Sequence, residues 1–284
     1  MLSRKREQLK PLLKWAGGKR HIANVLISSF PEGWDKQTYF EPFIGGAALF
    51  FELNPNKAVI SDVNKRLIGF YKHVRENLDL LIEEIQLLSA NFDESQDEFK
   101  KEYFLKIRTE FNSSDVDSLE SASKLFALNK LCFNGLYREN SKGGFNVPFG
   151  QKKKFPRIEI EDFRSANQAL QRADIVVSDF EETVSCAQSG DFIYFDPPYI
   201  PIDSTSSFTT YHADGFTLED QKRLARLLLE LKEKKIKAIC SNSDTEKTRE
   251  IYAGLNVSVI QAPRMVSARS SGRGLINELV ISNY

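Results

Sequence analysis

Two kinds of apolar pattern alternate in the first part of the chain. Residues 38–41 form a short apolar run closed by Pro42, and the stretch 47–53 that follows has the composition of an apolar helix. A second run at 57–61 precedes an amphipathic stretch that begins near Asn64. Strands that alternate with helices in this way predict a mostly parallel sheet.

The same alternation returns in the last part of the chain. Strand candidates lie at 173–177, 191–195, 237–240, 257–261 and 279–282. Among them, a long amphipathic stretch begins at Thr217, a favourable N-cap residue, and carries leucines at helical spacing. We expect an α/β fold with helices on both faces of the sheet, and the last two runs paired as antiparallel strands.

The strand pattern is interrupted in the middle of the chain. Helix candidates lie at 79–88, 99–111 and 121–131, followed by a loop rich in glycine and asparagine at 134–150. We interpret residues 73–162 as a helical domain inserted into the sheet domain. The sheet domain is then expected to comprise residues 1–72 and 163–284.

Composition excludes several classes of protein. The 284 residues carry 39 Lys and Arg against 39 Asp and Glu, a formal net charge of zero, so bulk positive charge cannot hold nucleic acid or an anionic membrane. No apolar run has the length that spans a bilayer. The three cysteines (Cys132, Cys186 and Cys240) show no pairing motif, and no spacing with histidine predicts a metal site. We expect a cytosolic protein without disulfides or metal.

The charges are nevertheless unevenly distributed. Residues 1–20 carry seven basic side chains against one acidic, as do residues 130–157, whereas residues 76–120 carry thirteen acidic against four basic. Each window alone is usually a solvated face. The window 130–157 also interleaves its cations with phenylalanines and asparagines, which suits contacts with phosphates and base edges. The composition of this window therefore suits a loop that reads a nucleic-acid duplex.

The sharpest chemical signal is Asp196-Pro197-Pro198-Tyr199, which directly follows the strand candidate 191–195. A stiff turn is the simpler interpretation, but open α/β sheets bind ligands beyond the carboxyl ends of their strands. The two prolines fix the backbone and direct a carboxylate, a carbonyl and an aromatic face at one place. The carboxylate and carbonyl suit the two hydrogens of an exocyclic amine, and the aromatic face suits an extruded base.

Four short motifs occur along the chain in a characteristic order. They are Lys14-Trp15-Ala16-Gly17-Gly18-Lys19, Glu41-Pro42-Phe43-Ile44-Gly45-Gly46, Ser61-Asp62-Val63-Asn64 and Asp196-Pro197-Pro198-Tyr199. With them the chain resembles the Dam-type DNA adenine methyltransferases of the α group, from about residue 12 to the C-terminus. The stretches 134–138 and 144–150 resemble the target-reading loop of members that methylate GATC. The resemblance is greatest to duplex-specific methylases of the Dpn type of restriction system.

This resemblance implies a Rossmann-like sheet that binds S-adenosyl-L-methionine, and a role for individual residues. The catalytic residues would be Asp196, Pro197 and Tyr199. The S-adenosyl-L-methionine site would include Trp15, Lys19, Glu41, Phe43, Gly45, Asp62 and Asp196. DNA would be contacted by Lys14, Phe133, Asn134, Leu136, Arg138 and Pro148. Within these sets, Tyr199 would stack on the flipped adenine and Arg138 would read a guanine.

The leading hypothesis is therefore an adenine-N6 methyltransferase acting on double-stranded GATC and protecting DNA beside a restriction endonuclease. An orphan enzyme of repair or replication control remains open, as does an enzyme of this fold acting on cytosine N4 or RNA. A non-catalytic DNA-binding regulator is a rival from another class. The sequence also leaves open the oligomeric state, activity on single strands, and whether the loop with Arg264, Arg269 and Arg273 contacts DNA.

Overall fold

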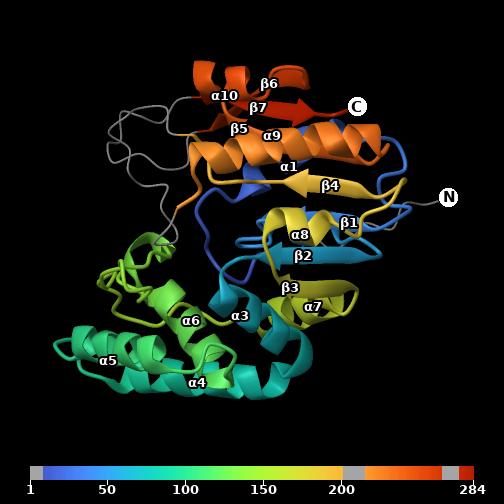
Figure 1. Ribbon diagram of the computed structural model, residues 1–284. Coiled ribbons are helices and arrows are strands. Elements are labelled where there is room, and N and C mark those ends of the chain that lie inside the picture. The colour runs from blue at the N-terminus through green and yellow to red at the C-terminus, as the bar shows by residue number, and fades with distance from the viewer. Residues whose placement is uncertain (1–8, 201–214, 264–274) are drawn as a thin grey trace. The chain divides into compact units, whose positions relative to one another are not determined.

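Figure 1 shows the computed structural model, which describes residues 9–200, 215–263 and 275–284. The chain crosses several times between two compact units. The helical unit comprises the described residues of 1–18, 45–55 and 64–175, and the sheet unit those of 19–44, 56–63 and 176–284. The helical unit thus holds the expected insertion 73–162 together with the N-terminal segment and flanking helices. None of the described helices is long and apolar enough to cross a membrane.

A seven-stranded sheet is formed by the described residues, in the order β3-β2-β1-β4-β5-β7-β6. Its strands are β1 (Tyr39–Pro42), β2 (Ala58–Asp62), β3 (Ala173–Val177), β4 (Phe192–Phe195), β5 (Lys237–Ser243), β6 (Asn256–Pro263) and β7 (Leu275–Ser282). The pairs β1–β2, β1–β4 and β4–β5 are parallel, whereas β7 runs antiparallel to both β5 and β6. The predicted α/β class and the terminal antiparallel pair are confirmed.

The register of the parallel strands brings their carboxyl ends to one edge. Tyr39 lies opposite Ala58 on one side and Phe192 on the other, so β1, β2 and β4 run in step. Asp62 ends β2 and Asp196 directly follows β4. Two carboxylates expected in the functional site therefore leave the sheet at the same edge.

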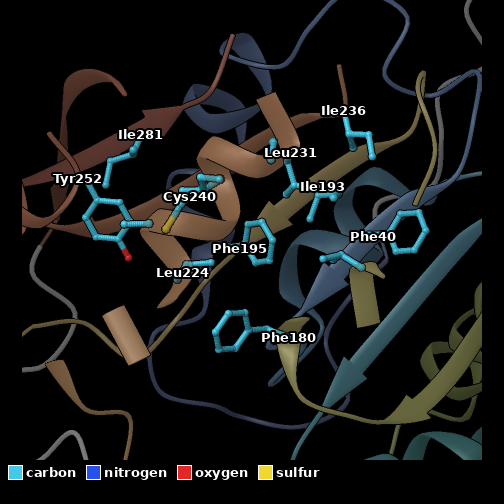
Figure 2. Packing of buried hydrophobic residues seen from close by; sticks show 14 of the residues in the cluster. Phe40, Phe180, Ile193, Phe195, Leu224, Leu231, Ile236, Cys240, Tyr252 and Ile281 are labelled. Carbon is cyan, nitrogen blue, oxygen red and sulfur yellow. The ribbon is translucent and has the colours of Figure 1, made fainter. Parts of the chain in front are cut away.

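One face of the sheet is covered by α8 (Phe180–Val184) and α9 (Leu218–Glu233). Figure 2 shows side chains from these helices and from the strands meeting in one hydrophobic cluster. Leu224 and Leu228, which are fully buried, lie on the inward face of α9, as the leucine spacing predicts. Burying each such side chain contributes about 2 kcal/mol.

The opposite face of the sheet is lined by alternate strand residues. Phe192 packs against Phe30, which follows α1 (Ala23–Ser28), with ring centroids 4.5 Å apart. Trp34 contacts Tyr39 of β1 in the same aromatic group. Because neighbouring strand residues point to opposite faces, an apolar layer on each side makes the strands apolar throughout.

The start of α9 is fixed by a capping box. Thr217 accepts a hydrogen bond from the Asp220 backbone N–H, and the Asp220 carboxylate accepts one from the Thr217 backbone N–H. The predicted N-cap is confirmed. The sheet unit also contains α10 (Glu246–Ile251) and the 3₁₀ turn η1 (Lys19–His21).

The helical unit is built around α6, of which ten of thirteen residues are buried. Its helices are α2 (Ala48–Leu53), α3 (Lys65–Glu76), α4 (Leu78–Glu94), α5 (Lys100–Ser113), α6 (Leu119–Leu131) and α7 (Ile160–Leu170), with the 3₁₀ turn η2 (Phe133–Gly135). Asn64 caps α3 by accepting a hydrogen bond from the Leu67 N–H. Each of the three helices predicted in the insertion is present and extends somewhat further than expected.

Candidate active site

The carboxylate of Asp196 is held by two side chains of the sheet unit. The Lys19 ammonium lies 2.8 Å from Oδ1 and donates a hydrogen bond to Oδ2 at 3.0 Å. Ser241 of β5 donates its hydroxyl to Oδ1 at 3.1 Å, and the Tyr194 hydroxyl lies 2.8 Å from that of Ser241. The orientation of Asp196 is therefore set by contacts from η1 and β5.

Burial and hydrogen bonding act in opposite directions on Asp196. Its side chain is 19% exposed and that of Lys19 only 4%. Burial raises the pKa of Asp196, whereas the Lys19 ammonium and the Ser241 hydroxyl lower it, and the net shift is upward. The ionised carboxylate depends on Lys19 to remain charged in this environment.

The backbone of the Asp-Pro-Pro-Tyr turn is tied to the sheet unit by buried amides. Gln221 of α9 donates a hydrogen bond to the Pro198 carbonyl at 2.8 Å. The Gln221 carbonyl in turn accepts from Asn242 and from the Tyr252 hydroxyl. Asn242 Oδ1 accepts from the Ile200 N–H at 3.3 Å. Two prolines and these contacts leave the turn little conformational freedom.

Tyr199 lies in the same turn, and both its ring and its hydroxyl make contacts. The Lys19 ammonium lies 4.6 Å from the centre of the ring, a cation–π distance. The hydroxyl donates a hydrogen bond to Glu278 Oε2. Burial, followed by the charges of Asp196 and Glu278, holds the pKa of Tyr199 well above its ordinary value. The phenol therefore stays protonated and acts as a donor.

The other carboxylates at this sheet edge belong to the last residues of β1 and β2. Glu41 is buried and accepts a hydrogen bond from the Tyr39 hydroxyl at 2.7 Å. Asp62 is half-buried, and its backbone carbonyl accepts from the Ser178 N–H at 3.3 Å. Phe43 has a φ of 67° and stacks on Phe180 with centroids 5.4 Å apart. The edge combines acceptors with an apolar ring surface.

Trp15 and Gly45 lie together in the helical unit. The Trp15 ring stacks on Tyr137, with centroids 5.0 Å apart and planes 21° from parallel. Gly45 has a φ of 48°, and a Cβ there would lie 2.9 Å from Trp15 Cδ1. Any side chain at residue 45 would therefore displace the indole.

Lys14 is joined to the loop 132–150 by one buried amide. Asn129 of α6 accepts a hydrogen bond from the Lys14 N–H at 2.9 Å and donates to the Lys14 carbonyl at 2.8 Å. The same amide donates to the Gly135 carbonyl at 3.1 Å. Gly135 has a φ of 67°, and a Cβ there would lie 2.6 Å from the Lys14 side chain. Lys14 and the loop therefore form one rigid group.

The next residue of α6 strengthens this connection. Lys130 donates a hydrogen bond to the Leu12 carbonyl at 2.8 Å. Burial, with a smaller contribution from the Lys14 charge, lowers the pKa of Lys130 to about 8. Two cations, one from each basic window of the sequence, thus lie close together in the helical unit.

The loop itself has few regular backbone pairs. The Phe133 N–H donates to the Pro148 carbonyl at 2.9 Å, and the Phe133 side chain is 52% exposed. Asn134, with a φ of 56°, and Pro148 are also exposed, and Leu136 is half-buried. Arg138 is exposed and donates Nε to Asn146 Oδ1 at 2.7 Å. The exposed side chains stand on a loop with a defined backbone.

A second amide fixes the far side of this loop. Asn112 of α5 accepts from the Phe145 N–H at 2.8 Å and donates to the Phe145 carbonyl at 3.1 Å. Asn112 and Asn129 thus each pair with both backbone groups of a residue distant in the sequence. Such side-chain pairing substitutes for a neighbouring strand.

The expected site residues fall into one group in each unit. The sheet unit brings together Lys19, Asp196 and Tyr199, with Pro197 in the same turn and Glu41, Phe43 and Asp62 at the same edge. The helical unit holds Trp15 with Gly45, and Lys14 with the loop residues. Sequence reasoning missed the supporting residues Ser241, Gln221, Asn242, Glu278, Asn129 and Asn112.

Some of these missed residues left a signal in the sequence. Glu278 is a charged residue directly before the apolar run 279–282. The polar residues 241–243 directly follow the apolar strand candidate 237–240. Polar side chains at buried strand positions need partners, which is a reason to examine them. Arg264, Arg269 and Arg273 lie outside the described residues. No cluster of His, Cys, Asp or Glu suited to a metal ion occurs in the described part of the chain.

Comparison with known proteins shows which sequences this chain is similar to. The sequence model of the D12 class N6 adenine-specific DNA methyltransferases matches residues 15–266. The chain is 41% identical to the type II methyltransferase M1.LlaDCHI of Lactococcus lactis subsp. cremoris, over 100% of this chain and 99% of the relative. It is 37% identical to a DNA adenine methylase of Vibrio cholerae serotype O1, covering 95% of each chain. For a DNA adenine methylase of Escherichia coli strain K12, the identity is 32% over 95% of this chain and 94% of the relative.

Proposed function

The chain belongs to the D12 class of N6 adenine-specific DNA methyltransferases, and we propose that it methylates adenine N6 within double-stranded GATC. The methyl donor that the family implies is S-adenosyl-L-methionine. The observation that carries the site assignment is the buried group of Asp196, Lys19 and Tyr199 at the carboxyl edge of the sheet. The GATC target rests on the loop 134–150 and its resemblance to GATC-reading loops.

The residues at the sheet edge fit S-adenosyl-L-methionine. This ligand offers hydroxyl and ammonium donors, a positive sulfonium and a planar base. The edge offers the carboxylates of Glu41 and Asp62 and the Phe43 ring, which are acceptors and an apolar face of matching chemistry. Carboxylates at strand ends receive ribose hydroxyls in other nucleotide-binding folds. We assign Glu41, Phe43, Asp62, Lys19 and Asp196 to this ligand, with Trp15 and Gly45 of the helical unit.

The bound S-adenosyl-L-methionine supplies the methyl group. The protein's own task is to make the adenine amine a nucleophile, because its lone pair is shared with the ring. Asp196 accepts one amine hydrogen, and we assign the other to the Pro197 carbonyl, since Gln221 binds that of Pro198. Two acceptors localise the lone pair on nitrogen. Tyr199 stacks on the extruded base.

Lys19 has a double role in this scheme. Before the target arrives, its ammonium neutralises Asp196 and contacts the Tyr199 ring. An adenine that bonds to Asp196 and stacks on Tyr199 contacts the same two side chains that Lys19 contacts. Lys19 keeps the carboxylate ionised until the amine hydrogen replaces part of that contact.

We assign recognition of the target to the loop of the helical unit. Arg138 presents a guanidinium whose Nε is fixed by Asn146, so its remaining donors keep one orientation toward a guanine. Leu136 and Pro148 are assigned to the thymine methyl groups. Exposed Phe133 and Asn134 are assigned to the space that the flipped base leaves.

Labelled methyl transfer tests this function. The enzyme is given duplexes that contain GATC or the same bases in scrambled order, and the product is digested to nucleosides. We expect label in N6-methyl-2′-deoxyadenosine from the GATC duplex only. Equal labelling of both duplexes would reject the target sequence, and label in a methylated deoxycytidine would reject adenine as the target base.

We further propose that the enzyme protects DNA as the partner of a restriction endonuclease that cuts GATC. Support comes from the relative named as a type II methyltransferase, whereas the relatives named DNA adenine methylases support a role without a nuclease. The two roles are separated by the neighbouring genes. A nuclease that cuts unmethylated GATC should be encoded beside this gene, and its absence would favour the second role.

A further inference from the structure

The Tyr199 hydroxyl is bound by a carboxylate from a distant part of the chain. It donates a hydrogen bond to Glu278 Oε2 at 2.9 Å. Glu278 lies in β7, is 6% exposed, and stands opposite Ser243 of β5 and Ile260 of β6. Within the described residues, the Tyr199 hydroxyl provides the one side-chain hydrogen bond of this carboxylate. This hydrogen bond joins a buried carboxylate of β7 to a side chain of the Asp-Pro-Pro-Tyr turn.

The remainder of the turn is already immobilised by other residues. Gln221 holds the Pro198 carbonyl, Asn242 holds the Ile200 N–H, and Ser241 holds the Asp196 carboxylate. These contacts fix the backbone but leave the side-chain torsions of Tyr199 to be set separately. Glu278 binds the far end of that side chain, where a lateral force has its longest lever arm about χ1. Because a phenolic O–H prefers to lie in the plane of its ring, the direction of this hydrogen bond also favours one ring plane.

We propose that Glu278 is a positioning residue that sets the plane of the Tyr199 ring for stacking on the target adenine. This inference rests on the proposed function, in which Tyr199 stacks on the flipped base. A hydrogen bond to an ionised carboxylate is shorter and stronger than one to a neutral acceptor, so Glu278 restricts the ring more than an amide would. With one face contacted by Lys19 and the hydroxyl held by Glu278, the ring meets the base already oriented.

A double-mutant cycle tests the proposal. The variants are Glu278→Gln, Tyr199→Phe and their combination, with Glu278→Leu as the complete loss of an acceptor. The first readout is the single-turnover methylation rate on a GATC duplex with both substrates saturating. The second is the fluorescence of a duplex whose target adenine is replaced by 2-aminopurine, which brightens on extrusion and is quenched by stacking.

We expect Glu278→Leu to slow single-turnover methylation about tenfold, with the KM for DNA unchanged, and Glu278→Gln to slow it less. The 2-aminopurine signal should rise above that of the wild type because the extruded base is stacked less well. In the Tyr199→Phe background, Glu278→Gln should have no further effect, since the hydroxyl that it orients is gone. The matched control is Ile281→Val, a mild core substitution in the same strand, which should leave both readouts unchanged.

The outcomes separate this inference from the proposed function. A wild-type enzyme that neither methylates the GATC duplex nor brightens 2-aminopurine rejects the proposed function and this inference with it. An active wild type whose rate and fluorescence are unaltered by Glu278→Gln and Glu278→Leu overturns this inference alone. The same holds if the effect of Glu278→Gln persists in full in the Tyr199→Phe background. If Glu278→Leu fails to fold, the cycle with Glu278→Gln decides.

Discussion

The Asp-Pro-Pro-Tyr turn of the sheet unit and the loop 132–150 of the helical unit achieve rigidity by different means. The turn follows a buried parallel strand and contains two prolines. It receives hydrogen bonds from residues on α9 and β5 and donates one to a residue on β7. The loop has little regular secondary structure and is attached to its unit by two asparagines, Asn129 and Asn112. Both present functional side chains on a fixed backbone.

The difference concerns where the constraint comes from. In the turn, local sequence already restricts the backbone, and distant residues refine the positions of Asp196 and Tyr199. In the loop, the local sequence permits many conformations, and the amides of the buried Asn129 and the exposed Asn112 select one of them. Substitutions in the turn should therefore affect the chemical step, whereas substitutions at the amides should affect stability and target recognition together.

The largest effect is expected for Asp196→Asn. The amide keeps the size of the carboxylate but removes the charge that attracts the amine hydrogen, so the methylation rate should fall about a thousandfold. Binding of a GATC duplex, measured by fluorescence anisotropy, should remain close to that of the wild type. Asp174→Asn, which makes the same change at an exposed position, is the control and should leave the rate unaltered. Turnover that survives in Asp196→Asn would remove this residue from the catalytic role.

The next largest effect is expected for Asn129→Leu. The leucine leaves the Lys14 N–H, the Lys14 carbonyl and the Gly135 carbonyl without their partner, which should cost about 3 kcal/mol of the free energy of unfolding. The KM for DNA should rise more than kcat falls. Denaturant unfolding and steady-state kinetics measure these quantities.

Asn112→Leu is the matched comparison for Asn129, since it makes two backbone contacts on the far side of the same loop. It should destabilise the protein less and leave Lys14 in place, so the KM for DNA should change less. Equal effects on KM in the two variants would contradict a special connection between Asn129 and the residues proposed to contact DNA.

Lys19→Met tests how the turn maintains its charge. Lys19 lowers the pKa of Asp196 against the stronger effect of burial, so its loss should raise that pKa further. The acidic limb of the pH–rate profile should then move to higher pH. Because the folded-state pKa of Asp196 lies above its ordinary value, the destabilisation should be about 2 kcal/mol where Asp196 is ionised and should shrink as the pH falls toward that raised pKa.

The control for Lys19 is Lys222→Met, which removes an exposed ion pair with Glu219. Exposed pairs contribute little, so neither the pH–rate profile nor the unfolding free energy should change measurably. An unshifted acidic limb in Lys19→Met would show that Asp196 does not depend on Lys19 for its ionisation.

The smallest effect is expected for Arg138→Lys, which keeps the charge and loses the two-pronged donor. Discrimination between GATC and duplexes changed at one guanine should fall by about 1.5 kcal/mol, with little loss of rate on GATC itself. The ratio of kcat/KM values for the two duplexes measures this. Arg157→Lys, an exposed arginine of the same basic window, should leave the ratio unchanged. A uniform loss on all duplexes would identify Arg138 as a phosphate contact instead.

Much of the sheet and its chemical signal could be predicted from sequence because both depend on local pattern. The apolar runs at 38–41, 57–61 and 191–195 identified strands to within a residue or two, and Asp-Pro-Pro-Tyr is both stiff and rare. The parallel order of these strands then requires that their carboxyl ends share an edge. In this part of the molecule, local sequence is therefore enough to predict where the site residues lie.

Other features depended on contacts between residues far apart in the chain, which only the tertiary structure decides. Asn129 and Lys14 are 115 residues apart, and Tyr199 and Glu278 are 79 apart, so no local pattern links either pair. The sequence by itself determined the order of strands and helices, the family and the reactive turn. The folded chain decided which buried polar groups become partners, because a hydrogen bond in the interior is selected by the cost of leaving either group unpaired.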